Sequence, residues 1–211
     1  MSRHNLVVAI TFCVLAAAGT AYASSVEKIR NEKVVVTEST VAPGEQEPAA
    51  KLPSLIVYIS DGTVQMVPAT GATRKEIVKK GDTAFLPEGT GTLTNAGPSP
   101  LHIVRISFLT TGGTETWGKT GLPPNYALLV ENKYARAYDI KIPAHGSEPQ
   151  HTHKARVVVA LSGAELEHIL PDGSHQPSTL KTGEIAWRPA ATHIGHNLGA
   201  TDLWVVAVEP K

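Results

Sequence analysis

The chain has 211 residues, with 19 lysine and arginine side chains balanced by 19 aspartates and glutamates, so its formal net charge at pH 7 is zero. This balance excludes the strongly basic footprint that binding to nucleic acid or anionic lipid requires. The single cysteine, Cys13, lies near the N-terminus within the first 23 residues. The remaining chain therefore has no disulfide and no thiolate metal ligand.

Residues 1–23 have the pattern of a secretory signal peptide. A short basic start precedes an apolar run over residues 6–18, and the Ala-Tyr-Ala at 21–23 is a small-residue cleavage site. A membrane anchor is the alternative, but the run is shorter than the about 20 apolar residues that span a bilayer. The sequence predicts cleavage before Ser24, a secreted or periplasmic location, and no stable membrane insertion of the mature chain.

The rest of the chain has the pattern of β structure. Short runs rich in β-branched residues are separated by turn signals such as Ser-Asp-Gly, Pro-Asp-Gly and Lys-Thr-Gly. The clearest of these runs, in chain order, are 33–37, 55–59, 102–106, 157–161 and 203–208. No stretch has a convincing long helical period. Many short strands at this spacing predict an all-β sandwich or barrel.

One segment of the chain occurs twice. Residues 48–62 correspond without a gap to residues 149–163, and residues 81–87 correspond to residues 183–189. The second copy has histidines where the first has apolar residues or glycine. The repeat predicts two similar halves with polar, ligand-type residues in only one of them.

The positions of the repeat divide the chain. We expect one barrel over residues 26–110 and a second over residues 126–211. The segment 111–125 between them is rich in glycine, threonine and proline, which is typical of a linker.

The second half resembles the cupins. Their first motif is a glycine, a His-x-His pair, a glutamate and a second glycine, and their second motif combines Gly, Pro, Gly, His and Asn. The matching residues are Gly146, His151, His153 and Gly163 for the first motif, and Gly183, Pro189, His193 and Asn197 for the second. The resemblance implies two cupin-like double-stranded β-helix (jelly-roll) barrels in tandem, a bicupin whose first motif set is degenerate.

Three histidines are the candidate metal ligands. His151 and His153 are two residues apart on a predicted strand, so their side chains face the same side. His193, on the return strand or its turn, could supply a third nitrogen. Three neutral imidazoles suit a divalent transition metal and leave positions open for water or substrate. We expect iron, manganese, zinc, nickel or copper, against the alternative of a His-x-His pair that binds no metal.

Arg156 is the main departure from the cupin pattern. It stands where the family places its glutamate, counted back from Gly163. A guanidinium cannot ligate a metal and cannot lose its charge. If Arg156 points inward, it repels a cation unless an anion lies between them, and it could clamp a carboxylate or phosphate. If it points outward, it is a surface arginine.

Four other residues are weaker candidates. His196 could replace His193 as the third ligand, and Glu148 could swing in as a carboxylate ligand. Trp187 could line the ligand pocket or pack in a core between the barrels. Asn197 could support a ligand by a hydrogen bond or form a turn. The remaining histidines of the two halves are predicted to be surface or turn residues: His102, His145, His168 and His175.

Three functions remain open, because barrels of this kind carry many activities. The first is an exported metal-dependent enzyme, such as a dioxygenase, isomerase or lyase, acting on a small organic acid. The second is a non-catalytic binding module for an anionic small molecule. The third is a structural secreted protein with a remnant site. The expected partner is a small molecule and not nucleic acid, and monomer and homo-oligomer both remain open.

Overall fold

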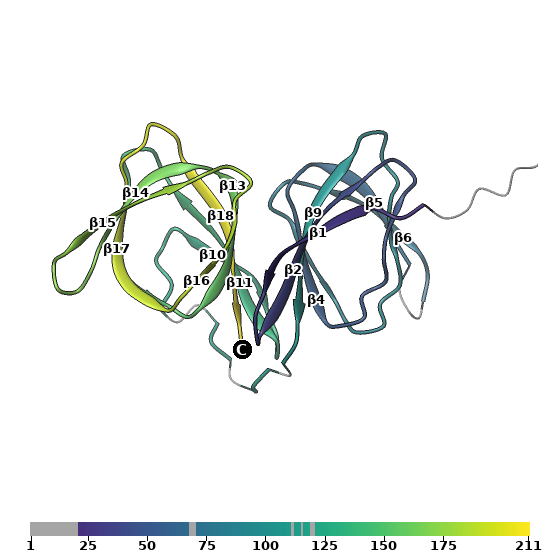
Figure 1. Ribbon diagram of the computed structural model, residues 1–211, viewed down its shortest axis with the longest axis horizontal. Helices are drawn as coiled ribbons and strands as arrows, with labels where there is room; N and C mark the ends of the chain where they lie inside the picture. The colour runs from purple at the N-terminus through teal and green to yellow at the C-terminus, as the bar shows by residue number, and fades with distance from the viewer. Residues whose placement is uncertain (1–20, 68–70, 111, 115, 119–120) are drawn as a thin grey trace, which may run out of the picture.

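The computed structural model describes residues 21–67, 71–110, 112–114, 116–118 and 121–211. The signal-peptide prediction falls almost entirely outside these residues. The described chain is built from β-strands joined by turns and loops, with no helix in those ranges (Figure 1). Within the described ranges, no helix is long and apolar enough to cross a membrane.

The first half contains nine strands in two sheets. The larger sheet has the order β1-β2-β9-β4-β7 and the smaller one the order β3-β8-β5-β6. The strands are β1 (Ser24–Arg30), β2 (Val34–Val41), β3 (Gln46–Glu47), β4 (Ser54–Tyr58), β5 (Gly62–Met66), β6 (Arg74–Val78), β7 (Thr83–Leu86), β8 (Leu93–Asn95) and β9 (Leu101–Phe108).

The second half repeats this arrangement strand by strand. Its sheets have the orders β10-β11-β18-β13-β16 and β12-β17-β14-β15, and every pairing in the four sheets is antiparallel. The strands are β10 (Tyr126–Glu131), β11 (Ala135–Ile142), β12 (Ser147–His153), β13 (Arg156–Ser162), β14 (Ala164–Ile169), β15 (His175–Leu180), β16 (Ile185–Arg188), β17 (Ala191–Asn197) and β18 (Leu203–Pro210). The predicted all-β class, with two jelly-roll barrels in tandem, is confirmed.

The strand pairings correct one detail of the residue correspondence between the two halves. Leu55 and Val157 occupy equivalent places, because each lies opposite the same position of its neighbouring strand, β9 or β18. The gap-free match of 48–62 with 149–163 is therefore one residue out in β4. Arg156 corresponds to Ser54 instead of Leu55, because the stretch from Glu148 to Arg156 is one residue longer than the equivalent stretch from Glu47 to Ser54.

The two larger sheets pack face to face and share one apolar core (Figure 1). Its fully buried members come from both halves: Val34, Val36, Leu55, Val57, Val104, Ile106 and Phe108 from the first, and Ala135, Ala137, Val157, Val159, Leu161, Val206 and Val208 from the second. Strands β4 and β13 are buried on both faces, toward this core and toward their own barrel. This explains why both read as continuous apolar runs and do not alternate.

Candidate metal centre

Two neighbouring strands bring the three histidines together. β12 pairs with β17, and His151 lies directly opposite His193. His153 is two residues further along β12, so it faces the same side as His151. The three side chains are 7%, 3% and 5% exposed for His151, His153 and His193. Their candidate ligand nitrogens all lie within 4.8 Å of one another, and no other such cluster exists among the described residues.

Hydrogen bonds determine which nitrogen of His151 faces its neighbours. Its Nδ1 lies 2.8 Å from the carbonyl oxygen of Pro149. A carbonyl oxygen only accepts, so Nδ1 carries the proton and donates it. In the neutral ring, Nε2 of His151 is then an unprotonated acceptor that points into the cluster.

His153 is oriented through Tyr138. The Tyr138 hydroxyl donates to Oε1 of Glu209 at 2.8 Å. Its oxygen lies 3.0 Å from Nδ1 of His153 and accepts a hydrogen bond from that nitrogen. The Nε2 atom of His153 is therefore also unprotonated, and it lies only 2.8 Å from Nε2 of His151.

Two bare acceptor nitrogens at this distance repel each other. The Tyr126 hydroxyl lies 3.2 Å from Nε2 of His151 and 3.4 Å from Nε2 of His153. It has one proton and can satisfy only one of them. A cation shared by both nitrogens removes the repulsion, so the donor set fits a metal ion.

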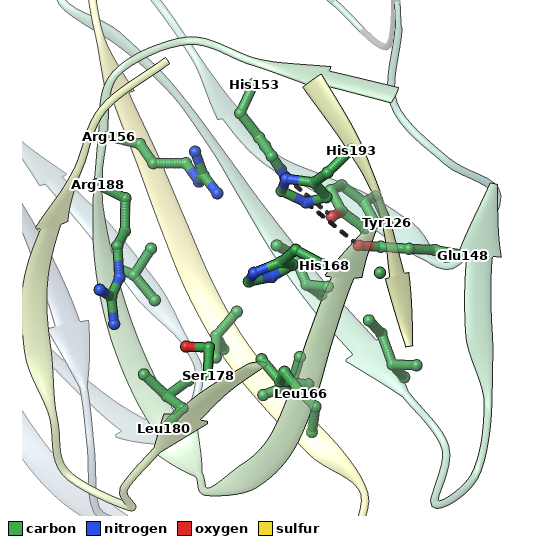
Figure 2. Close-up of a pocket in the computed structure, with 16 residues that line it drawn as sticks. Tyr126, Glu148, His153, Arg156, Leu166, His168, Ser178, Leu180, Arg188 and His193 are labelled. Atoms are coloured by element: carbon green, nitrogen blue, oxygen red, sulfur yellow. Dashed lines mark hydrogen bonds and ion pairs between the residues drawn. The ribbon is translucent and has the colours of Figure 1, made fainter. Parts of the chain in front are cut away.

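Glu148 adds a carboxylate to the cluster, as Figure 2 shows. Its Oε1 lies 3.5 Å from Nε2 of His151 and 3.9 Å from Nε2 of His193. Its Oε2 is buried with no hydrogen-bond partner among the described residues. Gly195 lies opposite Glu148 in the ladder, and a Cβ at that position would collide with Oε1. The glycine therefore leaves the space that the carboxylate occupies.

Burial sets the protonation of the histidine rings. It lowers the pKa of His193 to about 3, with further lowering by His168, His151 and Arg156. Burial likewise lowers the pKa of His153 far below its ordinary value, and the charge of Arg156 acts in the same direction. The rings of His153 and His193 are therefore neutral at pH 7, which is the form that binds metals. Burial has the opposite effect on the Glu148 carboxyl and raises its pKa.

A series of buried, hydrogen-bonded side chains supports His153 through its Nδ1 atom. Glu209 is fully buried and accepts hydrogen bonds from Tyr138, from Nε of Arg136 at 3.0 Å and from the backbone N–H of Lys154 at 2.9 Å. No sequence motif predicted this series of hydrogen bonds. Its one signal is an acidic residue at the end of the apolar strand β18, where a charge needs a partner.

A cavity of about 90 Å³ adjoins the histidines (Figure 2). Its polar end is formed by six side chains: Glu148, His153, Arg156, His168, Arg188 and His193. Its other lining side chains are mostly apolar and include Ile140, Ile142, Val158, Leu166, Leu180, Leu203 and Val205. The space thus combines a charged end beside the candidate ligands with an apolar floor.

Arg156 points into this cavity, which decides between its two predicted directions. The side chain is 8% exposed. Its closest polar contact is a long hydrogen bond of 3.4 Å from Nη1 to the carbonyl oxygen of Pro189, and its Nε has no partner. No carboxylate of the described residues lies within ion-pair distance of it. The other arginine of the cavity, Arg188, is paired with Glu184 at 3.1 Å.

Trp187 does not line the cavity, which corrects the prediction that it binds ligand. Side chains alternate along β16. Trp187 and Ile185 pack against the core between the barrels, and Arg188 faces the cavity. This is the alternative location that the sequence left open for the tryptophan.

Asn197 holds a turn and does not contact the histidine ligands. Its Nδ2 donates to the carbonyl oxygens of Ile142 and Thr201, and its Oδ1 accepts from the N–H of Gly199. Asn95 makes the same set of bonds in the first barrel, where the histidines are absent. The predicted supporting role at the metal site is therefore wrong, because the amide is occupied by the backbone.

Two other histidines, His196 and His168, lie in different surroundings. The side chain of His196 is 35% exposed and pairs with Glu167 at 3.7 Å, so it does not replace His193. His168, predicted to be a surface or turn residue, instead lines the cavity, with its ring centroid 4.4 Å from that of His193. His102, His145 and His175 are exposed.

No family model matches the chain, and no curated protein matches it. Solved structures do. AerE from Microcystis aeruginosa has a TM-score of 0.62 at 14% identity, covering 90% of this chain and 98% of that one. A cupin 2 conserved barrel domain protein from Leptotrichia buccalis has a TM-score of 0.59 at 14% identity, covering 93% of each chain.

An oxalate decarboxylase from Bacillus subtilis, described with Mn(II) centres, has a TM-score of 0.63 at 13% identity, covering 90% of this chain and 73% of that one. At these identities the likeness concerns the fold alone. The fold is that of the cupins.

Proposed function

We propose that the second barrel binds one divalent transition metal ion through Nε2 of His151, Nε2 of His153 and His193, and that a small organic acid reaches this ion through the adjoining cavity. One observation carries the proposal: two buried Nε2 atoms lie 2.8 Å apart, each in a ring whose Nδ1 has a hydrogen-bond partner. Metal–nitrogen bonds of about 2.1 Å allow two ligands of one ion to lie this close together or somewhat further apart.

Glu148 completes the proposed ligand set. Its buried carboxylate lies beside two of the three imidazoles and has an oxygen without a partner. Three nitrogens and one oxygen suit iron, manganese, zinc, nickel and copper without selecting one of them. The Mn(II) centres of the Bacillus subtilis oxalate decarboxylase are a reason to include manganese in any test.

Two activities are consistent with this centre. A metal ion with open coordination positions beside a cavity supports an enzyme, such as a dioxygenase, isomerase or lyase. The unpaired guanidinium of Arg156 supports an anion-binding module that needs no turnover. The two differ in whether the metal is required for ligand binding, so binding measured with and without metal separates them.

The proposal is tested by metal analysis of protein purified without a polyhistidine tag. We expect about one metal equivalent per chain. The double variant His151→Ala, His153→Ala should contain none. The matched control His102→Ala, His175→Ala removes two exposed histidines and should retain the full amount. Equal metal content in the two double variants would refute the ligand assignment.

We also propose that the protein is exported. Support comes from the signal-peptide pattern of residues 1–23, and β1 begins at Ser24, the predicted first residue of the mature chain. N-terminal sequencing of protein recovered from a periplasmic or secreted fraction should begin at Ser24. A start at Met1 in that fraction would contradict cleavage.

A further inference from the structure

Arg156 is a buried cation with too few partners. It is 8% exposed, and among the residues that the structure describes its Nε has no hydrogen-bond partner and its one hydrogen bond is 3.4 Å long. Burying a charge without a counter-charge is strongly unfavourable. A guanidinium cannot relieve this by losing its proton. The geometry therefore calls for an anion that arrives from outside the protein.

The cavity in front of Arg156 provides the place for that anion. The guanidinium and two candidate ligands, His153 and His193, line the same space (Figure 2). An anion there would lie between the arginine and the metal ion and would screen their repulsion. Arg188 is already matched by Glu184, so the cavity has one unmatched arginine.

The apolar lining of the cavity determines what kind of group the anion can carry. Seven aliphatic side chains line the cavity, and Tyr126 and Ser178 supply the hydroxyls among its lining residues. A second charged group placed there would be buried without a partner, which is costly. An aliphatic tail placed there would instead gain about 0.8 kcal/mol for each buried methylene, or about fourfold in affinity.

We propose that the ligand is a short-chain aliphatic monocarboxylic acid, with its carboxylate on Arg156 and its tail on the apolar floor. This inference rests on the proposed function for the metal and names the class of acid. The cavity of about 90 Å³ is smaller than a cavity of about 150 Å³ that admits benzene. The tail is therefore short, and the aliphatic lining favours a methyl end over the second carboxylate of a dicarboxylate.

The test is calorimetry on the metal-loaded full chain with acetate, butyrate, octanoate, succinate, butylamine and inorganic phosphate. Butyrate should bind about tenfold or more tighter than acetate, because each added methylene gives about fourfold. Octanoate should bind more weakly than butyrate, because its tail exceeds the cavity. Succinate, phosphate or butylamine binding as tightly as butyrate would overturn the proposal.

The variant Arg156→Gln should lower butyrate affinity by about 10- to 100-fold, the usual effect of losing a hydrogen bond to a charged group. The matched control Arg74→Gln, an exposed arginine of β6, should leave butyrate affinity unchanged. Metal content is measured in every sample. Unchanged butyrate affinity in Arg156→Gln with full metal content would refute this inference alone, whereas wild-type protein without metal would refute the proposed function.

Discussion

The Tyr138 hydroxyl oxygen lies 3.0 Å from Nδ1 of His153 and thereby determines which nitrogen of that ring faces the cavity. Because this hydroxyl donates its own proton to Glu209, it can only accept from His153. The charge of Glu209, held in place by Arg136, therefore controls the tautomer of a candidate metal ligand through one intervening residue. Such partners fix ligand orientation at metal sites.

Tyr138→Phe should weaken metal binding by about 10- to 100-fold, the usual effect of losing a group that orients a ligand. It should also lower the free energy of unfolding by about 1–3 kcal/mol, because Nδ1 of His153 loses its partner in a buried place. Competition with a chelator measures the first effect and urea unfolding the second. The control Tyr58→Phe, in the core of the first barrel, should leave metal affinity unchanged. Equal metal affinity in the two variants would contradict the role of Tyr138.

Glu148→Gln should weaken metal binding by at least about tenfold, because it removes the only negative charge among the proposed ligands, and even an indirect partner contributes that much. Gly195→Ala should have a similar effect by displacing the carboxylate, since a Cβ there meets Oε1 of Glu148. The control Glu165→Gln changes an exposed acid of β14. Metal titrations of the three variants measure these effects. If Glu148→Gln binds metal as tightly as the control, Glu148 is not a ligand and the centre has only its three histidines.

Glu148 shows why the sequence identified the histidines more readily than their carboxylate neighbour. Residues an even number apart on a strand face the same side, so His151 and His153 could be paired directly. Glu148 and His151 are three apart, which predicts opposite sides. A β-bulge between them shifts the register and turns both inward. Nothing in the sequence pattern marks that bulge.

The positions of His168 and Arg156 could not be predicted from the sequence, for a different reason. Both face the cavity, but that follows from the register of β14 and β13 against their neighbours. The short turn between His153 and Arg156 left the strand register, and with it the direction of Arg156, open, and His168 belongs to no motif. The presence of two similar barrels, in contrast, followed from the repeat, because two copies of a pattern restrain each other.

Acid should destabilise the metal-free protein. His153 and His193 have a lowered pKa in the folded protein, about 3 for His193, against about 6.5 in an unfolded chain. Below pH 6.5 the unfolded chain binds more protons at these residues, so their contribution to stability is complete above pH 6.5 and is lost as the pH falls toward 3. Glu148, whose pKa is raised, opposes this with a single group.

Urea unfolding in the presence of a chelator measures this loss. Each histidine should contribute up to about 1.4 kcal/mol per pH unit within the window. The variant His193→Gln should show a shallower dependence on pH than the wild type between pH 6.5 and 5. An identical slope in the two proteins would show that His193 is not held neutral by burial.

Trp187→Ala should destabilise the protein without changing its ligand site. The indole packs against the core shared by the two barrels, and removing a large buried aromatic side chain costs about 3–5 kcal/mol when it is fully buried. Trp187 is only partly buried, so we expect a loss of stability near the lower end of that range.

The neighbouring Arg188 faces the cavity. The matched variant Arg188→Gln should therefore have a small effect on stability and a measurable effect on butyrate binding. Because the core contains residues of both halves, thermal unfolding of Trp187→Ala should remain a single transition at lower temperature, since the barrels lose the same support together. Two separated transitions would contradict the shared core. A loss of butyrate affinity at a temperature where the variant is still folded would place the tryptophan in the ligand site.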